Sequence, residues 1–227
     1  MKKYLFILPL FLISCASQKV IYKTDDISIS SSVKNYPISV GVILFGDLRL
    51  QNDSDRVLFD NQRQIKLNGK QTCINAEKHY KKDSVAMQFT RMLVEHLNRS
   101  NIFQKVYFCK NSTKDYYITG NLKSFIGIQD FSSKALVGAQ FGLIGALATA
   151  GAKTPANITI EITDLKLHKQ NGEIVRDFGN FSKTYSEDLH ADAYCWCIYA
   201  NINNKLKEFN SELIEKIRTD LSEVKFE

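Results

Sequence analysis

Hydrophobic positions along the 227-residue chain recur with the periods of strands and helices, and these periods predict its elements. A nearly continuous apolar run over residues 38–45 predicts a buried strand. Apolar positions at helical spacing predict an amphipathic helix over residues 84–99, capped by Asp83 or Ser84. A second helical series, with apolar residues three or four apart, predicts one long helix over residues 198–221 that packs on a sheet.

Two further strands are expected in the middle of the chain. Residues 103–109 form a short apolar strand, and residues 116–128 form a longer one with alternating apolar positions. The apolar side chains that share one parity in the longer strand are Ile118, Leu122, Ile126 and Ile128. These four side chains are therefore expected on one face of the strand.

A strand pair is expected further along the chain. Isoleucines alternate with polar residues over 158–162, and the apolar parity then changes at 165–167. This change predicts a bulge or bend at Thr163–Asp164, because side chains in a strand alternate between its two faces. Asn171–Gly172 is a strong hairpin signal, so a returning strand is expected over about residues 173–185.

The order of these elements predicts one α+β (or α/β) domain over residues 37–227. It would contain a mixed or antiparallel sheet of about five strands, packed by two helices. Residues 51–82 are polar and read as irregular, with a turn at Asn68–Gly69. No repeat or second domain is indicated.

The N-terminus carries a targeting signal. A basic start, Met1–Lys3, precedes an apolar run over residues 4–13 that is too short to span a bilayer. Leu12-Ile13-Ser14-Cys15 resembles the lipobox of bacterial lipoproteins. The resemblance implies a signal peptide over residues 1–14 and lipid on the Cys15 thiol.

The lipobox resemblance also implies a location. A chain that begins at Cys15 would be held in the cell envelope by its acyl chains, such as palmitate, with residues 15–36 as a tether. Ala16 follows the cysteine, and by resemblance to enterobacterial lipoproteins it implies outer-membrane sorting, facing the periplasm. The expected partners are the membrane, through the lipid, and either an envelope protein or a second copy of the chain.

The other cysteines are candidates for disulfides. Export to an oxidising compartment makes pairing among them plausible, and three complete pairings are possible. These cysteines are Cys73, Cys109, Cys195 and Cys197. Together with His190, the pair Cys195-Trp196-Cys197 could alternatively bind Cu(I) or Zn. We favour disulfide or buried cysteines, because a C-x-C pair without a second ligand pair is a weak metal signal.

Residues 135–152 form an uncharged, Ala/Gly-rich apolar insert between Lys134 and Lys153. Small residues fall four apart at Gly138, Gly142, Ala146 and Ala150, which as a helix would form one ridge. Three interpretations stay open: a helix packed within the domain or against another copy, a membrane-inserting element, and a Gly-rich loop between two strands. We favour packing or oligomer contact.

Several short motifs resemble envelope lipoproteins related to the TolB amino-terminal domain, including transport-auxiliary and curli-secretion channel lipoproteins. They are a first strand ending in Phe45-Gly46-Asp47-Leu48-Arg49, a Phe-x-x-Val strand at 103–106, an Asp-Tyr-x-x-x-Gly strand at 115–120 and the pair joined at 171–172. The resemblance implies that Asp47 and Arg49 lie at a strand end. We interpret them as a surface ion pair or turn of little energetic value.

Composition and motifs favour a protein that is not an enzyme. The net charge of +6 is mild and spread out, which does not favour nucleic acid binding. No nucleophile elbow, phosphate-binding loop or zinc-protease motif is present, so we expect no catalytic residue, cofactor or metal. His96 is expected to be a partly buried or surface side chain. The hypothesis is an accessory or assembly subunit of an envelope complex, and a membrane-inserting oligomer or a metal-binding protein or enzyme are the alternatives.

Overall fold

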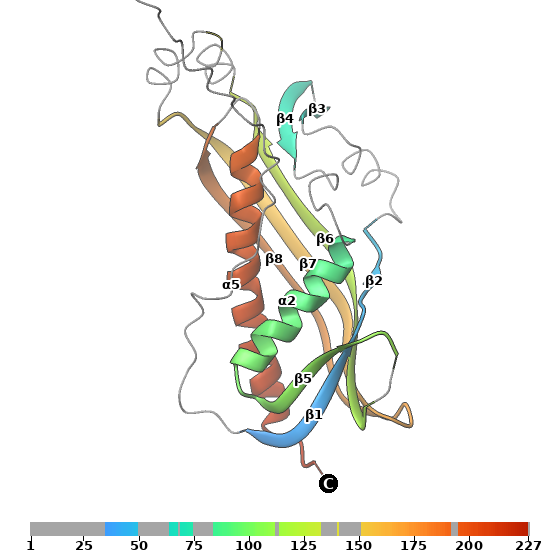
Figure 1. Cartoon of the computed structure of the whole chain (residues 1–227). Helices are drawn as coiled ribbons and strands as arrows, with labels where there is room; N and C mark the ends of the chain where they lie inside the picture. Colours follow the sequence, from blue (N-terminus) through green and yellow to red (C-terminus); the bar gives the residue numbers. More distant parts are fainter. Residues whose placement is uncertain are drawn as a thin grey trace, which may run out of the picture.

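The computed structural model describes residues 35–49, 64–67, 69–74, 84–111, 114–132, 140, 151–191 and 195–226. Figure 1 shows an elongated open sheet with two helices packed on one side. The strands are β1 (Tyr36–Ile43), β2 (Gly46–Asp47), β3 (Gln64–Leu67), β4 (Lys70–Ile74), β5 (Phe103–Cys109), β6 (Tyr116–Asp130), β7 (Lys153–Lys169) and β8 (Ile174–His190). The helices are α2 (Val85–Arg99) and α5 (Trp196–Leu221).

The long strand β6 organises the sheet. One of its edges pairs with β7 in antiparallel fashion along almost its whole length. The other edge is shared in turn by β1 and β2, which run parallel to it, and by β4, which runs antiparallel. Outer strands complete the sheet: β5 pairs with β1, β3 with β4 and β8 with β7. The expected α+β class with a mixed sheet and two helices is confirmed.

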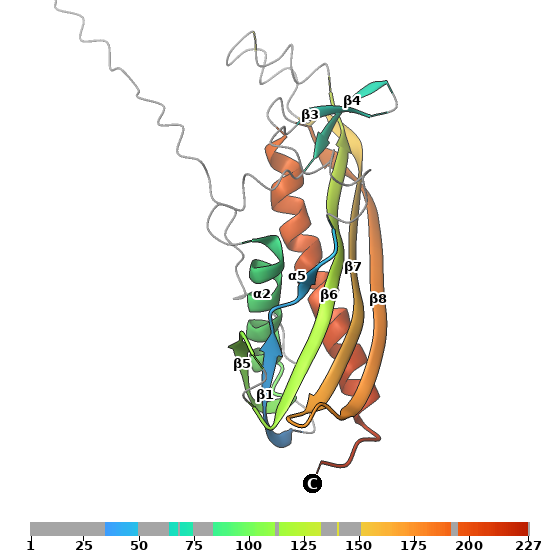
Figure 2. The ribbon, with the colours of Figure 1, turned by 90° about the vertical axis from the view of Figure 1, so that its right-hand side faces the viewer.

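Both helices cover the same face of the sheet, and the hydrophobic core lies between the helices and this face (Figure 2). Ser84 caps α2 by accepting a hydrogen bond from the Met87 N–H, as its side chain chemistry predicts. Phe89 of α2 contacts Phe209 of α5 edge to face, with ring centres 6.2 Å apart. The opposite face of β6–β8 is polar, with cross-strand contacts such as Lys123 to Glu161. The helices therefore cover the face that carries the buried apolar side chains and leave the polar face open.

Three short strands raise the count from about five to eight. β3 and β4 form a hairpin within the stretch that reads as irregular from its polar composition. Its turn includes Gly69, whose φ of +81° favours glycine, and the turn expected at this place is confirmed. β4 is held as a strand by its antiparallel pairing with β6, a partner that is distant in sequence.

The shared parity predicted along β6 is wrong, because the strand contains irregularities between Thr119 and Asn121 and between Leu122 and Ser124. Beyond them Phe125 is buried, whereas Ile126 and Ile128 are only half-buried. Gly127 then faces α5: a Cβ there would lie 3.0 Å from Ile198 Cγ1. The lack of a side chain lets the helix approach the strand closely.

The bulge predicted from the parity change in β7 is confirmed. Asp164 has a φ of +54°, and the pairing register with β8 shifts between Ile162 and Leu165. The Asp164 N–H donates to Asn180 Oδ1 at 3.1 Å, so the irregular backbone keeps a hydrogen bond. The shift turns Leu165 and Leu167 into the core. The hairpin expected at Asn171–Gly172 is likewise present.

Candidate functional site

Tyr36, where the first strand begins, and the last residues of β6 lie at opposite ends of the sheet. Tyr36 comes just before the point where β1 pairs with the start of β6. In the sequence, the apolar insert stands between the other end of β6 and the start of β7. The 15 residues of β6 separate these ends, which corresponds to about 50 Å at strand spacing.

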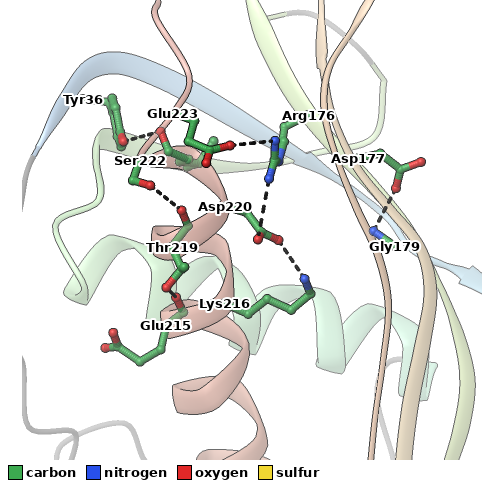
Figure 3. Close-up of polar contacts among 11 residues, drawn as sticks. Tyr36, Arg176, Asp177, Gly179, Glu215, Lys216, Thr219, Asp220, Ser222 and Glu223 are labelled. Carbon is green, nitrogen blue, oxygen red and sulfur yellow. Dashed lines mark hydrogen bonds and ion pairs between the residues drawn. The ribbon is translucent and has the colours of Figure 1, made fainter.

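Tyr36 fixes the point where the chain enters the body. Its hydroxyl donates to the Leu221 carbonyl oxygen at 2.5 Å, which joins β1 to the end of α5 (Figure 3). Its ring packs against Phe226 at 4.8 Å between centres. Burial raises the pKa of Tyr36 above its usual value, so the phenol remains a donor. The entry strand is therefore anchored to the C-terminal helix.

An ion-pair network closes the same end of the molecule. Arg176 of β8 lies 3.8 Å from Asp220 and 3.7 Å from Glu223 of the α5 terminus (Figure 3). Asp220 also accepts a hydrogen bond from Lys216 at 2.7 Å. These groups are partly exposed, so each pair adds little energy. Together they hold the start of β8 against the C-terminal end of α5.

A groove of about 720 Å³ opens beside this end. It lies where β1, β5 and β6 begin and where the β7–β8 hairpin turns. Its lining residues are Pro37, Ile38, Ser39, Gln104, Asp115, Tyr116, Lys169, Gln170 and Asn171. The lining offers one carboxylate, one ammonium group and several amides. Such groups suit hydrogen bonding to a polar chain segment.

The other end of the sheet is closed by a disulfide. Cys73 of β4 is bonded to Cys195 at the start of α5, with Cα atoms 5.4 Å apart and a sequence separation of 122. Cys195 itself has a φ of +61°. The bond therefore ties the β3–β4 hairpin to the long helix.

Gln129 reinforces this end from inside the sheet. Its side-chain amide is 1% exposed and donates to Thr154 Oγ1 at 3.0 Å. The same nitrogen lies within hydrogen-bond distance of the Leu189 and His190 carbonyl oxygens, at 3.3 and 3.0 Å. One buried amide thus joins the ends of β6, β7 and β8, next to the place where the insert begins.

The remaining predicted site residues do not come together. Cys109 and Cys197 are half-buried and form no disulfide among the described residues. His190 is exposed, and the Cys195 sulfur is engaged with Cys73, so the metal alternative lacks one of its ligands. Within the described ranges, no group of three His, Cys, Asp or Glu residues is placed to hold a metal ion. Five residues of the predicted sites lie outside the described residues: Cys15, Gly138, Gly142, Ala146 and Ala150.

Asp47 and Arg49 form a buried ion pair, which corrects the surface interpretation. Arg49 is 1% exposed, and its Nε and Nη2 donate to the two Asp47 oxygens at 2.9 and 2.6 Å. Asp47 is the last residue of β2 and Arg49 follows the strand, so the pair lies at a strand end, as the family resemblance implies. Arginine is rarely buried, which is why its sequence context favours a surface position.

His96 is also more deeply placed than expected. It lies on α2 and is 1% exposed. Burial, and then the charges of Arg99 and Lys207, lower the pKa of His96 to about 4. The imidazole is therefore neutral at physiological pH.

A row of charges joins β8 to the flank of α5. Lys183 lies 2.5 Å from Glu212, and Glu187 lies 3.5 Å from Lys205. Between the two pairs, burial and then the charges of Glu212 and Glu208 raise the pKa of Tyr185 above its usual value. This row lies along the outermost strand of the sheet. It was not recognised from the sequence, because its members are distributed over two elements.

The sheet's other long margin, β5, is covered. Asn98 of α2 accepts from the Val106 N–H and donates to the Val106 carbonyl oxygen, both at 2.8 Å. The guanidinium of Arg91 lies over the Phe108 ring at 5.5 Å. Side chains of α2 thus cover part of this margin, and Asn98 takes the two backbone hydrogen bonds that a further strand could make at Val106.

Comparisons with known proteins found no matching family model and no matching curated protein. Solved structures do match. A Xanthomonas campestris protein of family DUF330 covers 86% of this chain and 91% of its own, at 11% identity and a TM-score of 0.49. The PelC dodecamer from Paraburkholderia phytofirmans covers 83% and 92% at 8% identity, with a TM-score of 0.35.

A third similar structure is a putative neuraminyllactose-binding hemagglutinin homolog from Helicobacter pylori. It covers 86% of this chain and 90% of its own, at 12% identity and a TM-score of 0.36. All three are bacterial proteins. At these identities none of them transfers a function to this chain, so its function is argued from its own residues.

Proposed function

We propose that the chain is a lipid-anchored protein of the bacterial envelope that acts by protein contact, as an accessory or assembly subunit. The lipid would be carried on Cys15, with residues 15–36 as the tether. The body that follows offers a sheet, a groove and charged margins, all of which suit contacts with proteins.

The observation that carries this proposal is the Cys73–Cys195 disulfide. Disulfides persist in oxidising compartments such as the bacterial periplasm and are rare in the cytosol. The bond therefore supports the export that the N-terminal signal implies. The two arguments are independent, because one rests on residues 1–15 and the other on cysteines far along the chain.

The arrangement of the ends supports an anchored body. Tyr36 fixes the entry of the chain at one end through Leu221 and Phe226. A tether that leads there would hold the disulfide-bonded end away from its membrane by about the length of β6. No helix within the described ranges is long and apolar enough to cross a bilayer.

Labelling and fractionation test the proposal. Cells grown with a radiolabelled fatty acid should label the wild-type chain and the Cys109→Ser variant, and leave the Cys15→Ser variant unlabelled. The Cys15→Ser variant should also leave the membrane fraction. Label on the Cys15→Ser variant, or a wild type without label in the soluble fraction, would refute lipid anchoring.

In vivo cross-linking tests the contact role. A photoreactive amino acid at Gln170, in the groove, should capture an envelope protein or a second copy of the chain. The matched control position is Lys123, on the polar face of the sheet and outside the groove. Absence of any protein adduct from Gln170, in cells where the chain is present and folded, would oppose a function by contact through the groove.

A second candidate is a membrane-inserting oligomer that uses residues 135–152. The observation that favours it is the position of this uncharged insert in the sequence, between β6 and β7, which meet at the end of the sheet remote from Tyr36. A Gly142→Glu variant should then lose assembly in detergent, whereas an unchanged oligomer would exclude this role. Deleting the insert tests the same point by a larger change.

A further inference from the structure

The outer edge of β8 is the long open margin of the sheet. Among the described strands only β7 pairs with β8, although β8 has 17 residues. The backbone groups on the other side of an edge strand are available to a further strand. From Phe181 to His190 the pairing with β7 is continuous, so this part of β8 is regular.

The first part of β8, residues 174–179, is not suited to pairing with a further strand. The register with β7 shifts around Phe178, and Gly179 has a φ of +70°. The Gly179 N–H donates to Asp177 Oδ1 at 2.8 Å, and Arg176 is held by the α5 terminus (Figure 3). A bulge of this kind twists an edge away from partners. The pairing-competent segment is therefore residues 180–190.

The partner that fits this segment is a second copy of itself. In an antiparallel pair centred on Tyr185, each Lys183 stands opposite Glu187 of the other copy, and each Phe181 stands opposite Leu189. The remaining opposed pairs are Thr184 with Ser186, Ser182 with Asp188 and Asn180 with His190. No like charges are opposed, and opposite-charge and apolar pairs across strands are stabilising.

The helix flank extends this complementarity. Within one copy Lys205 bonds Glu187 and Lys183 bonds Glu212. The twofold axis at Tyr185 brings the first pair next to the second pair of the other copy, because it exchanges residues 183 and 187. Four charges of alternating sign, from Lys205, Glu187, Lys183 and Glu212, then run across the interface on each side of the axis.

We propose that the chain forms a twofold dimer in which the β8 edges pair in antiparallel register about Tyr185, joining two sheets into one. On the β5 margin, in contrast, Asn98 already occupies both backbone groups of Val106. An edge that pairs with its own copy about a twofold axis gives a closed dimer rather than a chain of subunits. This inference does not depend on lipid anchoring, so either can fail alone.

Site-specific disulfide formation tests the register. The background is the full chain with Cys15→Ser, Cys109→Ser and Cys197→Ser, which leaves only the Cys73–Cys195 bond. Thr184→Cys protein mixed with Ser186→Cys protein should form a cross-linked dimer on mild oxidation, because opposed Cβ atoms lie about 4.5–5.5 Å apart. Thr184→Cys alone should link far less, since its copies would be diagonal neighbours at about 7–8 Å.

A second mixture controls for random collision. Asn180→Cys and Ser182→Cys lie on the same exposed face, but in this register they are opposed to His190 and Asp188. Their mixture should therefore give only the background level of cross-linking. Equal yields from the two mixtures, or no link between positions 184 and 186, would overturn the proposed register.

Charge reversal tests the contact energetics by light scattering and sedimentation. Lys183→Glu alone should raise the dissociation constant of the dimer by about tenfold or more, because the twofold repeats each repulsion. A variant that reverses the whole row, Lys183→Glu with Glu187→Lys, Lys205→Glu and Glu212→Lys, should restore much of the affinity, because every pair within a copy and across the axis is then again of opposite sign. Lys123→Glu is the matched control, since it breaks a comparable exposed pair with Glu161 away from the edge.

The wild-type oligomeric state decides the proposal as a whole. A dimer that Lys183→Glu weakens and the reversal of the whole row recovers supports it. A wild-type chain that stays monomeric at high micromolar concentration overturns it. A dimer that ignores both charge variants overturns the β8 interface.

Discussion

The guanidinium of Arg49 is almost completely buried and is held by both carboxylate oxygens of Asp47, two residues earlier in the chain. The carboxylate is itself about a quarter exposed. The pair therefore places a positive charge inside the body and its counter-charge at the surface. Removing the carboxylate would take away the two hydrogen bonds that it accepts from this buried guanidinium.

Asp47→Ala should therefore be strongly destabilising, by about 3 kcal/mol in the free energy of unfolding. The measurement is urea denaturation followed by far-UV circular dichroism. Glu161→Ala is the control, because it removes the partner of the exposed Lys123 and should cost less than about 1 kcal/mol. Equal losses in the two variants would show that the Arg49 pair behaves as a surface pair.

The disulfide should make a large contribution to stability. Cys73→Ser, which removes the bond to Cys195 across 122 residues, should lower the free energy of unfolding by about 2–5 kcal/mol. Mass spectrometry of the unreduced protein should recover the two cysteines in one linked peptide pair. Cys109→Ser should leave both results unchanged, and a linked pair that includes Cys109 would contradict the assignment.

Asn98 should stabilise the margin of the sheet. Asn98→Ala removes both hydrogen bonds to Val106, each of which contributes about 1 kcal/mol, so a loss of about 2 kcal/mol is expected. Asn201→Ala is a matched control, since its amide bonds only the Cys197 carbonyl oxygen within α5. Hydrogen exchange at the Val106 amide should accelerate in Asn98→Ala alone. Unchanged exchange there would contradict this role of Asn98.

The helices and long strands could be predicted because their apolar side chains recur with the period of a helix or a strand. The bulge at Asp164 was predictable because the apolar parity changes there, and the change is visible in the sequence itself. The irregularity in β6 was not, because Ile126 and Ile128 stay apolar although they lie away from the helices. Apolar residues on both faces hide a register shift.

Long-range contacts account for most of what the sequence did not predict. β4 is polar and short, and it is held by pairing with β6 and by the bond from Cys73 to Cys195. No local pattern selects that pairing among the three that four cysteines allow. The charged row of β8 and α5 is similar, since Lys183 and Glu212 meet only after the helix packs on the sheet.

The last prediction concerns pH. The pKa of His96 is lowered from 6.5 to about 4 in the folded chain, so below pH 6.5 the unfolded chain binds a proton that the folded chain does not. Stability should therefore fall as the pH drops from about 6.5 to about 4, with a loss from this residue of up to about 3 kcal/mol. Burial and the positive charges of Arg99 and Lys207 all disfavour the protonated form of His96. His96→Gln should flatten the dependence of unfolding free energy on pH in this window, whatever its effect at pH 7. Parallel pH profiles for the wild type and the variant would show that His96 titrates normally.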